Sequence, residues 1–209
     1  MNRCVIVGGA EIGRYNRIRT YLRSNDFYIF CDSGLNHAEP LQIAPALIVG
    51  DFDSHERPDT DVETIVLPCE KDDTDTVFAV KEAVRRGFED FLLIGVTGGR
   101  FDHTFGNISV LLYLDSLGKT ARIADDVSEM EIISRGKAEI DSSYPFFSLL
   151  NISGTARGIT ITGAKYPLDG AEISSEYQYG ISNEVIPGGK ACVRVGEGRL
   201  LLVKVCGED

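Results

Sequence analysis

Residues 48–54 read Ile-Val-Gly-Asp-Phe-Asp-Ser and place two carboxylates directly behind a short apolar run. Side chains two residues apart on an extended backbone point to the same side, so Asp51 and Asp53 can face one point. Two carboxylates about 4 Å apart repel each other by roughly 4 kcal/mol at an effective dielectric near 20. A hard divalent cation such as Mg²⁺, which prefers oxygen ligands, would relieve that repulsion. A solvated turn rich in Asp, Gly and Ser is the alternative, and this stretch alone does not separate the two.

Short apolar runs alternate with helical patterns through the first 120 residues, which predicts an α/β domain with a mainly parallel sheet. Helical spacing and end signals predict a helix over residues 14–23 and another from an N-cap at Thr74 to a stop at Gly87. A third helix follows residue 103, with Phe105 and Tyr113 expected to face inward. The predicted strands are residues 4–7, 27–31, 46–49, 64–67 and 91–95.

The pattern changes in the second part of the chain, where short β-type runs separated by turn residues replace the helical spacing. These runs predict an antiparallel sandwich or partial barrel. We therefore expect two domains, an α/β domain over residues 1–122 and an all-β sandwich over residues 123–209. The predicted strands of the second domain are residues 129–133, 137–140, 146–152, 158–163, 191–195 and 199–205.

The composition is that of an ordinary globular protein, with 43% hydrophobic and 25% charged residues among 209. No run approaches the roughly 20 apolar residues of a membrane span, and no signal-peptide layout is present, so we expect a cytoplasmic protein. The net charge of −11, from 32 acidic and 21 basic residues, argues against binding long nucleic acids. Most of the five cysteines sit in apolar runs, which favours buried free thiols over a zinc site or disulfides.

Polar side chains gather at the ends of the predicted parallel strands, where ligands bind in such sheets. Carboxylates without a second histidine or cysteine favour Mg²⁺ over Zn²⁺. Mg²⁺ with a lysine and an arginine equips a site for phosphoryl transfer, where positioning and charge neutralisation provide most of the catalysis. For His103, a hydrogen-bonded turn residue is favoured over a general base. The acids of this rim are Asp32, Asp51, Asp53, Asp72, Asp75 and Asp102, and the interleaved basic residues are Lys71, Arg100 and His103.

Two glycine-containing stretches lack the full pattern of a phosphate loop. Residues 8–13 miss the glycine spacing of the dinucleotide fingerprint. Residues 118–120 end a helix, whereas a P-loop begins one. Gly8 and Gly9 would still allow a phosphate to approach the backbone.

Five short motifs occur in a fixed order along nearly the whole chain. They are Asp32-x-Gly34-x-Asn36; Gly50-Asp51-Phe52-Asp53-Ser54; Lys71-Asp72-x-Thr74-Asp75; Gly98-Gly99-Arg100-x-Asp102-His103, with Asn107 just beyond; and Gly180-Ile181-Ser182-Asn183. The set resembles the thiamine pyrophosphokinase (thiamine diphosphokinase) family, although each motif alone is weak. The resemblance implies an α/β nucleotide-binding domain, a β-sandwich, and a homodimer with its active sites between subunits.

The resemblance further implies transfer of a diphosphoryl group from ATP to the hydroxyl of thiamine, giving thiamine diphosphate and AMP, with Mg²⁺ as cofactor. Residues 1–122 would then form the catalytic domain and residues 123–209 the thiamine-binding domain. Because the chain has no tryptophan, Tyr177 and Tyr179 are the candidates for a cation–π contact with the thiazolium, with exposed loop tyrosines as the alternative. The implied roles are catalysis for Asp51, Asp53, Asp75, Arg100 and Asp102; metal binding for Asp51, Asp53 and Asp75; nucleotide and phosphate binding for Asp32, Gly34, Asn36, Lys71, Asp72, Thr74, His103 and Asn107; and thiamine binding for Ser182 and Asn183.

The mechanism that we expect is in-line attack of the thiamine hydroxyl on the β-phosphorus of ATP, with Asp75 or Asp102 accepting the proton. Two other functions remain open at this point. An Asp-x-Asp pair after a strand also serves Mg²⁺-dependent phosphatases, although there it normally follows the first strand of its domain. A nucleotide- or thiamine-binding sensor without catalysis is the third possibility. Neither a nucleic acid nor a membrane is an expected partner.

Overall fold

The computed structural model describes residues 3–52, 58–70, 72–134 and 136–207. The chain divides into two compact units, Met1–Asp126 and Val127–Asp209. Within the described residues, no helix is both long and apolar enough to cross a membrane.

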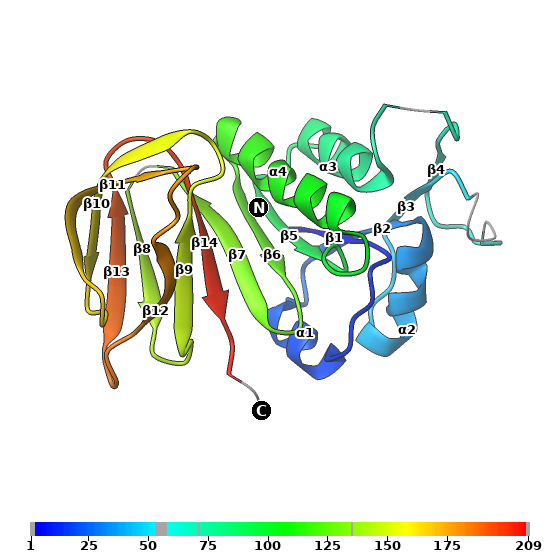
Figure 1. Ribbon diagram of the computed structural model, residues 1–209. Helices are drawn as coiled ribbons and strands as arrows, with labels where there is room; N and C mark the ends of the chain where they lie inside the picture. The colour runs from blue at the N-terminus through cyan, green and yellow to red at the C-terminus, as the bar shows by residue number, and fades with distance from the viewer. Residues whose placement is uncertain (1–2, 53–57, 71, 135, 208–209) are drawn as a thin grey trace. The chain divides into compact units, whose positions relative to one another are not determined.

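The first unit contains a parallel sheet in the strand order β6-β5-β1-β2-β3-β4 (Figure 1). The central strand β1 pairs on one side with β2 and on the other with β5, so Cys4 lies opposite both Phe27 and Phe91. The strands are β1 Cys4–Val7, β2 Phe27–Cys31, β3 Leu47–Gly50, β4 Thr64–Val66, β5 Asp90–Ile94 and β6 Thr120–Ala124, and the helices are α1 Tyr15–Tyr21, the 3-10 helix η1 Asp32–His37, α2 Ala38–Leu41, α3 Asp75–Arg85 and α4 Phe101–Ser116.

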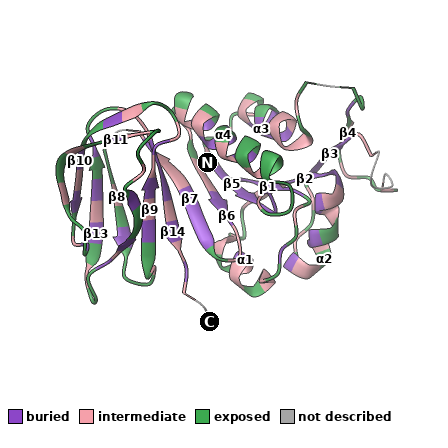
Figure 2. Ribbon diagram, in the orientation of Figure 1, coloured by how far each residue is buried: buried purple, intermediate pink, exposed green. Residues whose placement is uncertain are grey.

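Helices cover both faces of this sheet, with α1 and α2 on one side and α3 and α4 on the other (Figure 1). One face packs Val5 and Val7 of β1 against Ile18 of α1 and Leu41 of α2. Strands covered on both faces need apolar side chains at every position, which explains their continuous apolar runs. All four residues of β1 and of β3 are buried (Figure 2). The predicted α/β domain is confirmed.

The helix α3 begins and ends where its sequence signals predicted. The Thr74 hydroxyl accepts a hydrogen bond from the backbone N–H of Val77 at 3.3 Å, which is the N-cap interaction. Gly87, which follows the helix, adopts a φ of 87°, a conformation that favours glycine. The helix is therefore fixed at both ends by local chemistry.

The predicted inward face of α4 is wrong in part. Phe105 and Tyr113 are 52% and 38% exposed, whereas Asn107, Val110 and Leu111 are buried. The helix carries apolar residues on several sides, so their spacing alone does not define the buried face.

The strand β6 was not predicted from the sequence. It pairs in parallel with β5, placing Thr120 opposite Asp90, and it completes the sheet of the first unit. Its polar Thr120 and Arg122 interrupt the apolar run that marked the other strands. The expected domain boundary after residue 122 falls inside this strand, and the two compact units meet at Asp126 and Val127.

The second unit is formed by two antiparallel sheets, β12-β9-β14-β7 and β11-β10-β13-β8. One apolar core contains Phe147 of β9, Ile161 of β10 and Leu202 of β14, so side chains from both sheets share it. The predicted all-β sandwich is confirmed, although β11 and β12 were missed. The strands are β7 Ser128–Ile133, β8 Gly136–Asp141, β9 Phe146–Leu150, β10 Thr155–Thr162, β11 Leu168–Ser174, β12 Gly180–Glu184, β13 Lys190–Val195 and β14 Leu200–Val205.

Candidate active site

A pocket of about 540 Å³ opens at the carboxyl ends of β1, β2, β3 and β5 in the first unit. Its volume lies within the range of roughly 300 to 1,000 Å³ that is usual for small-molecule sites. The loops that follow these strands and the first turns of α3 and α4 form its wall. The predicted residues that line it are Gly8, Gly9, Asp32, Asp51, Thr74, Asp75, Arg100, His103 and Asn107.

Three of the predicted acids reach the pocket from three different elements. Asp32 begins η1 directly after β2 and is only 8% exposed. Asp51 follows β3, and Asp75 is the first residue of α3, next to the N-cap Thr74. Parallel strands end at one edge of a sheet, so residues far apart in sequence converge there. The pocket therefore has a strongly acidic wall.

The backbone is strained at this wall. Among the described residues, four other than glycine have a positive φ: Asp32 at 41°, Gln42 at 59°, Phe52 at 55° and Ser182 at 57°. Three of the four lie in the predicted motifs, while Gln42 follows the end of α2. A left-handed conformation costs a non-glycine residue about 1 to 2 kcal/mol. Strain of this kind concentrates at binding sites and active sites, which supports a functional role for the three motifs that contain Asp32, Phe52 and Ser182.

Arg100 lines the pocket and forms an ion pair with Asp102. Arg100 Nη2 lies 2.5 Å from Asp102 Oδ2, and Arg100 Nε donates to Oδ1 at 3.1 Å. The hydrogen bonds from Arg100 lower the pKa of Asp102 to about 2. Asp102 is not among the residues that line the pocket, so the structure does not bring it to one point with Asp51. Its observed partner is the guanidinium of Arg100.

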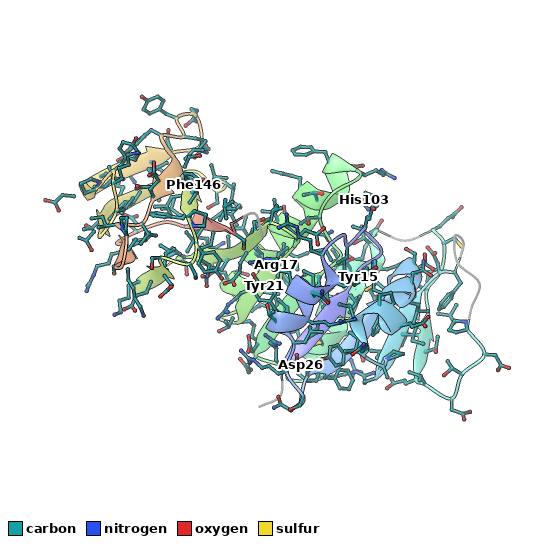
Figure 3. All side chains as sticks on the ribbon, turned by 90° about the horizontal axis from the view of Figure 1, so that it is seen from below. Tyr15, Arg17, Tyr21, Asp26, His103 and Phe146 are labelled. Atoms are coloured by element: carbon teal, nitrogen blue, oxygen red, sulfur yellow. The ribbon has the colours of Figure 1, made fainter. Side chains whose placement is uncertain are left out.

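Asn107 fixes the loop after β5. The side chain is 8% exposed, and Nδ2 donates to the Val96 carbonyl at 2.8 Å. Both residues line the pocket. His103, one turn earlier in α4, is exposed at the pocket, and its backbone N–H donates to Asp102 Oδ1 at 3.0 Å (Figure 3).

Other predicted residues lie elsewhere or outside the description. Asp53 and Lys71 are outside the described residues. Asn36 and Asp72 are exposed and do not line the pocket. Gly34 is buried against β1, because a Cβ there would lie 2.3 Å from the Val7 carbonyl oxygen. Its observed role is close packing of η1 on the sheet.

Sequence reasoning missed three polar residues of the pocket, namely Glu11, Ser33 and Thr76. Each lies within a few residues of a position that was predicted. The Gly8–Gly9 pair could have identified Glu11, because it predicted that this loop lies beside a ligand, and Glu11 is only two residues further along the same loop. A Cβ on Gly9 would lie 1.9 Å from the Ser33 hydroxyl, so this glycine lets the loop and η1 approach each other.

The donor chemistry of the pocket fits a hard cation. The described acids that line it offer oxygen atoms, and in the described part of the chain no three Asp, Glu, His or Cys side chains form a complete metal cage. Mg²⁺ usually takes one or two carboxylates and fills its remaining positions with water and phosphate oxygens. Asp51 and Asp75 supply such a partial set.

In the second unit, Ser182 and Asn183 have different surroundings. Ser182 is exposed, and its backbone N–H donates to the Ser148 hydroxyl at 3.0 Å. Asn183 is 5% exposed, and its amide group hydrogen-bonds to the backbone of Tyr166 and Glu184 at 2.8 to 3.1 Å. The Asn183 side chain therefore holds β12 against the backbone at Tyr166, in the connection between β10 and β11.

Tyr177 and Tyr179 form an exposed aromatic pair. Their exposed fractions are 70% and 41%, and their ring centroids lie 5.4 Å apart with 43° between the planes. The Tyr179 hydroxyl donates to the Glu172 carbonyl at 2.5 Å. This bond fixes the Tyr179 ring. The exposed faces of the two rings are suited to contact a flat cation.

The fold and the pocket define an α/β protein with an acidic, glycine-walled site, followed by an antiparallel β unit. The family model described as "Thiamin pyrophosphokinase, catalytic domain" matches residues 18–123, and the model described as "Thiamin pyrophosphokinase, vitamin B1 binding domain" matches residues 132–200. The chain belongs to the thiamin pyrophosphokinase family. The resemblance of the five motifs is thus confirmed.

Individual members of the family are similar to this chain over nearly its full length. Thiamine pyrophosphokinase from Bacillus subtilis (strain 168) is 28% identical over 207 residues, which cover 95% of this chain and 96% of that protein. The crystal structure of thiamin pyrophosphokinase from Geobacillus thermodenitrificans has a TM-score of 0.83 at 28% identity and covers 99% of both chains. The Candida albicans enzyme shares the fold, with a TM-score of 0.78 at 15% identity over 99% of this chain and 89% of that one.

Proposed function

We propose that this protein is an enzyme that transfers a diphosphoryl group from ATP to the hydroxyl of thiamine, giving thiamine diphosphate and AMP. The observation that carries the proposal is the order of the two units. An acid-lined pocket at a sheet edge lies in the unit with the catalytic-domain match, and the vitamin B1 binding match follows it. Family membership favours this activity over a phosphatase or a sensor.

The triphosphate of ATP is the ligand that we assign to the pocket of the first unit. Gly8 and Gly9 allow close approach to the backbone, and Arg100 supplies a positive side chain. The first turns of α3 and α4 also line the pocket, and helix N-termini attract anions. These groups offset phosphate charge and align the β-phosphorus for in-line attack.

Mg²⁺ is the cofactor that we assign to the acidic wall, with Asp51, Asp53 and Asp75 as its protein ligands. When bound, it would neutralise charge on the phosphate oxygens. The strained backbone at Phe52, the residue directly after Asp51, supports this placement, because strain of this kind concentrates at binding sites.

Asp75 is our choice for the group that accepts the proton of the thiamine hydroxyl. It lines the pocket, and Asp102, the other candidate, does not. A carboxyl group whose pKa is lowered to about 2 is also a weak base, and Asp102 is such a group because of Arg100.

For thiamine we propose the exposed Ser182 and the aromatic pair Tyr177 and Tyr179. We further propose a homodimer in which these residues complete the pocket of the partner subunit. The amide of Asn183 is hydrogen-bonded within its own unit, so we assign it the positioning of β12.

Product analysis tests the function. Incubation with ATP, Mg²⁺ and thiamine should give AMP and thiamine diphosphate in equal amounts. Release of free phosphate would indicate a phosphatase instead, and unchanged nucleotide would indicate a sensor. Omission of thiamine is the control, since AMP should then not form.

A further inference from the structure

One wall of the pocket is a loop, residues 8–11, whose backbone is held from several directions. On the side of β5, the Gly8 N–H donates to the Ile94 carbonyl at 2.9 Å and the Ala10 N–H donates to the Gly95 carbonyl at 2.8 Å. Further along the chain, the Asp126 carboxylate accepts hydrogen bonds from the N–H groups of Gly13 and Arg14 at 2.7 and 2.9 Å. The first set of contacts holds the loop itself, and the second holds the residues that directly follow it.

The carbonyl of Ala10 is held by a histidine. His37, the last residue of η1, is 6% exposed, and its Nε2 lies 3.0 Å from the Ala10 oxygen. Its Nδ1 lies 2.8 Å from the hydroxyl of Tyr15, the first residue of α1. A carbonyl oxygen only accepts hydrogen bonds, so Nε2 carries a proton and donates it. In the neutral ring, Nδ1 then accepts from the Tyr15 hydroxyl, which selects this tautomer.

The 3-10 helix η1 therefore contacts the loop at both of its ends. Ser33, near its start, lies against Gly9, and His37, at its end, bonds to Ala10. The same element supplies Asp32 to the pocket. The hydrogen bond from His37 to Ala10 thus links the loop of residues 8–11 to the 3-10 helix that carries Asp32.

We propose that His37, oriented by Tyr15, is a positioning residue for nucleotide binding, which holds the loop of residues 8–11 in the conformation that receives the phosphates of ATP. The inference rests on the proposed function, because the ligand is the nucleotide. Loss of the donor on Nε2 would leave the Ala10 carbonyl free to turn. The pocket would then be competent only part of the time, and apparent affinity falls by that fraction.

Four variants test this role. His37→Leu removes both hydrogen bonds, whereas His37→Gln keeps an N–H that can donate to Ala10. Tyr15→Phe removes only the hydroxyl that selects the tautomer. Tyr21→Phe is the matched control, because Tyr21 is the last residue of the same helix and its hydroxyl accepts from Arg17 Nη2 at 2.9 Å (Figure 3).

The primary measurement is binding of ATP with Mg²⁺ by titration calorimetry, without thiamine. His37→Leu should raise Kd by about five- to tenfold, the effect of one lost buried hydrogen bond. Tyr15→Phe should raise it by a smaller factor, and His37→Gln and Tyr21→Phe should stay within about twofold of the unaltered protein. In steady state, His37→Leu should raise KM for ATP and leave KM for thiamine unchanged.

A pH series separates positioning from general stability. Burial lowers the pKa of His37, and the groups that face its ring are the Tyr15 hydroxyl of α1 and the Ala10 carbonyl. When His37 is protonated, Nε2 still donates to the Ala10 carbonyl, but Nδ1 becomes a donor and no longer accepts from the Tyr15 hydroxyl. As the pH falls, the unaltered protein should therefore lose ATP affinity beyond that of His37→Gln by no more than the factor that Tyr15→Phe shows. Titration of ATP itself is common to both proteins, so a larger excess loss would contradict the assignment of the Nε2–H as the group that holds the loop.

The outcomes are distinguishable. If the unaltered protein neither binds ATP nor makes thiamine diphosphate, the proposed function fails. If it does both, and folded His37→Leu binds ATP within twofold of it, the positioning role is overturned. A rise in Kd that His37→Gln shares equally with His37→Leu would overturn it too, because the retained donor should restore binding. Thermal unfolding of each variant shows that the compared proteins are folded.

Discussion

At the scale of single residues, the carboxylates of the pocket should matter through their charge. Asp51 and Asp75 line it from two elements, and an amide of the same shape removes the charge without changing the packing. We expect Asp51→Asn and Asp75→Asn each to reduce turnover by about 100- to 1,000-fold, the usual cost of one stabilising group at a reacting phosphate or oxyanion. Initial rates of AMP formation test this, with thermal unfolding to verify the fold. Activity within a few-fold of the unaltered enzyme would contradict the assignment.

Asp102 should behave differently. Because Arg100 lowers the pKa of Asp102 to about 2, its carboxylate is charged at every higher pH and is protonated only as the pH falls through that value. The acidic limb of the rate profile between about pH 4 and 7 should therefore keep its midpoint in Asp102→Asn, while KM for ATP changes as Arg100 loses its partner. A shifted midpoint would show that Asp102 titrates in catalysis after all.

These two cases show what the sequence determines at this scale. Asp32, Asp51 and Asp75 were predictable because each follows a strand end or begins a helix, and such ends converge in a parallel sheet. The surroundings of Asp102 and Asn183 were not predictable from the sequence. Their side chains find partners, Arg100 and the Tyr166 backbone, whose distances follow from local backbone geometry rather than from residue spacing.

At the scale of elements, the end of α2 carries avoidable strain. Gln42 follows Leu41 in a left-handed conformation with a φ of 59°, is exposed, and does not line the pocket. Glycine adopts this conformation without steric cost. Gln42→Gly should raise the free energy of unfolding by about 0.5 to 1 kcal/mol and the Tm by about 1 to 4 °C. Turnover should be unchanged, and a lower Tm would show that the Gln42 side chain makes contacts worth more than the strain.

The helix α3 is held by a charge cluster that should make its stability depend on pH. Hydrogen bonds, first from Arg85 and then from Arg86, lower the pKa of Glu82 to about 2, and Arg86 also bonds to Glu63 before β4. The folded pKa lies below the ordinary value, so the stabilisation is present above about pH 4.5 and is lost as the pH falls toward 2. Glu82→Gln should therefore be less stable than the unaltered protein to urea at neutral pH.

The same measurement near pH 2 provides the control for Glu82. The difference between Glu82→Gln and the unaltered protein should shrink there, because Glu82 is then protonated in the unfolded chain and about half protonated in the folded one. Glu39→Gln, an exposed change on α2, should show little difference at either pH. An equal loss at both pH values would mean that Glu82 acts through packing rather than charge.

In the first unit, the strands that are buried on both faces could be predicted from the sequence. The strands β1, β3 and β5 were found because helices cover both faces and, apart from Asp90 at the start of β5, their positions carry no polar side chain. The strand β6 was missed because its first three residues are not fully buried and include Thr120 and Arg122. Burial against a neighbouring element decides such cases, and a single sequence does not contain that information directly.

At the scale of the whole molecule, each unit has its own apolar core, and each matches a separate family model. The acids of the pocket belong to the first unit and Ser182 to the second, so the proposed reaction needs residues from both. In a homodimer these residues could come from one protomer or from two. The proposed arrangement, in which Ser182 completes the pocket of the partner subunit, makes a quantitative prediction.

Mixing two inactive variants distinguishes the arrangements. Asp75→Asn disables the first unit and Ser182→Leu the second. In a random mixture, half of the dimers are mixed, and each mixed dimer has one intact site of two when sites form between subunits. The mixture should recover about a quarter of the unaltered activity after joint refolding, with light scattering to measure the mass of the assembly. Each variant refolded alone is the control, and no recovery in a mixture of proven dimers would place all these residues within one protomer.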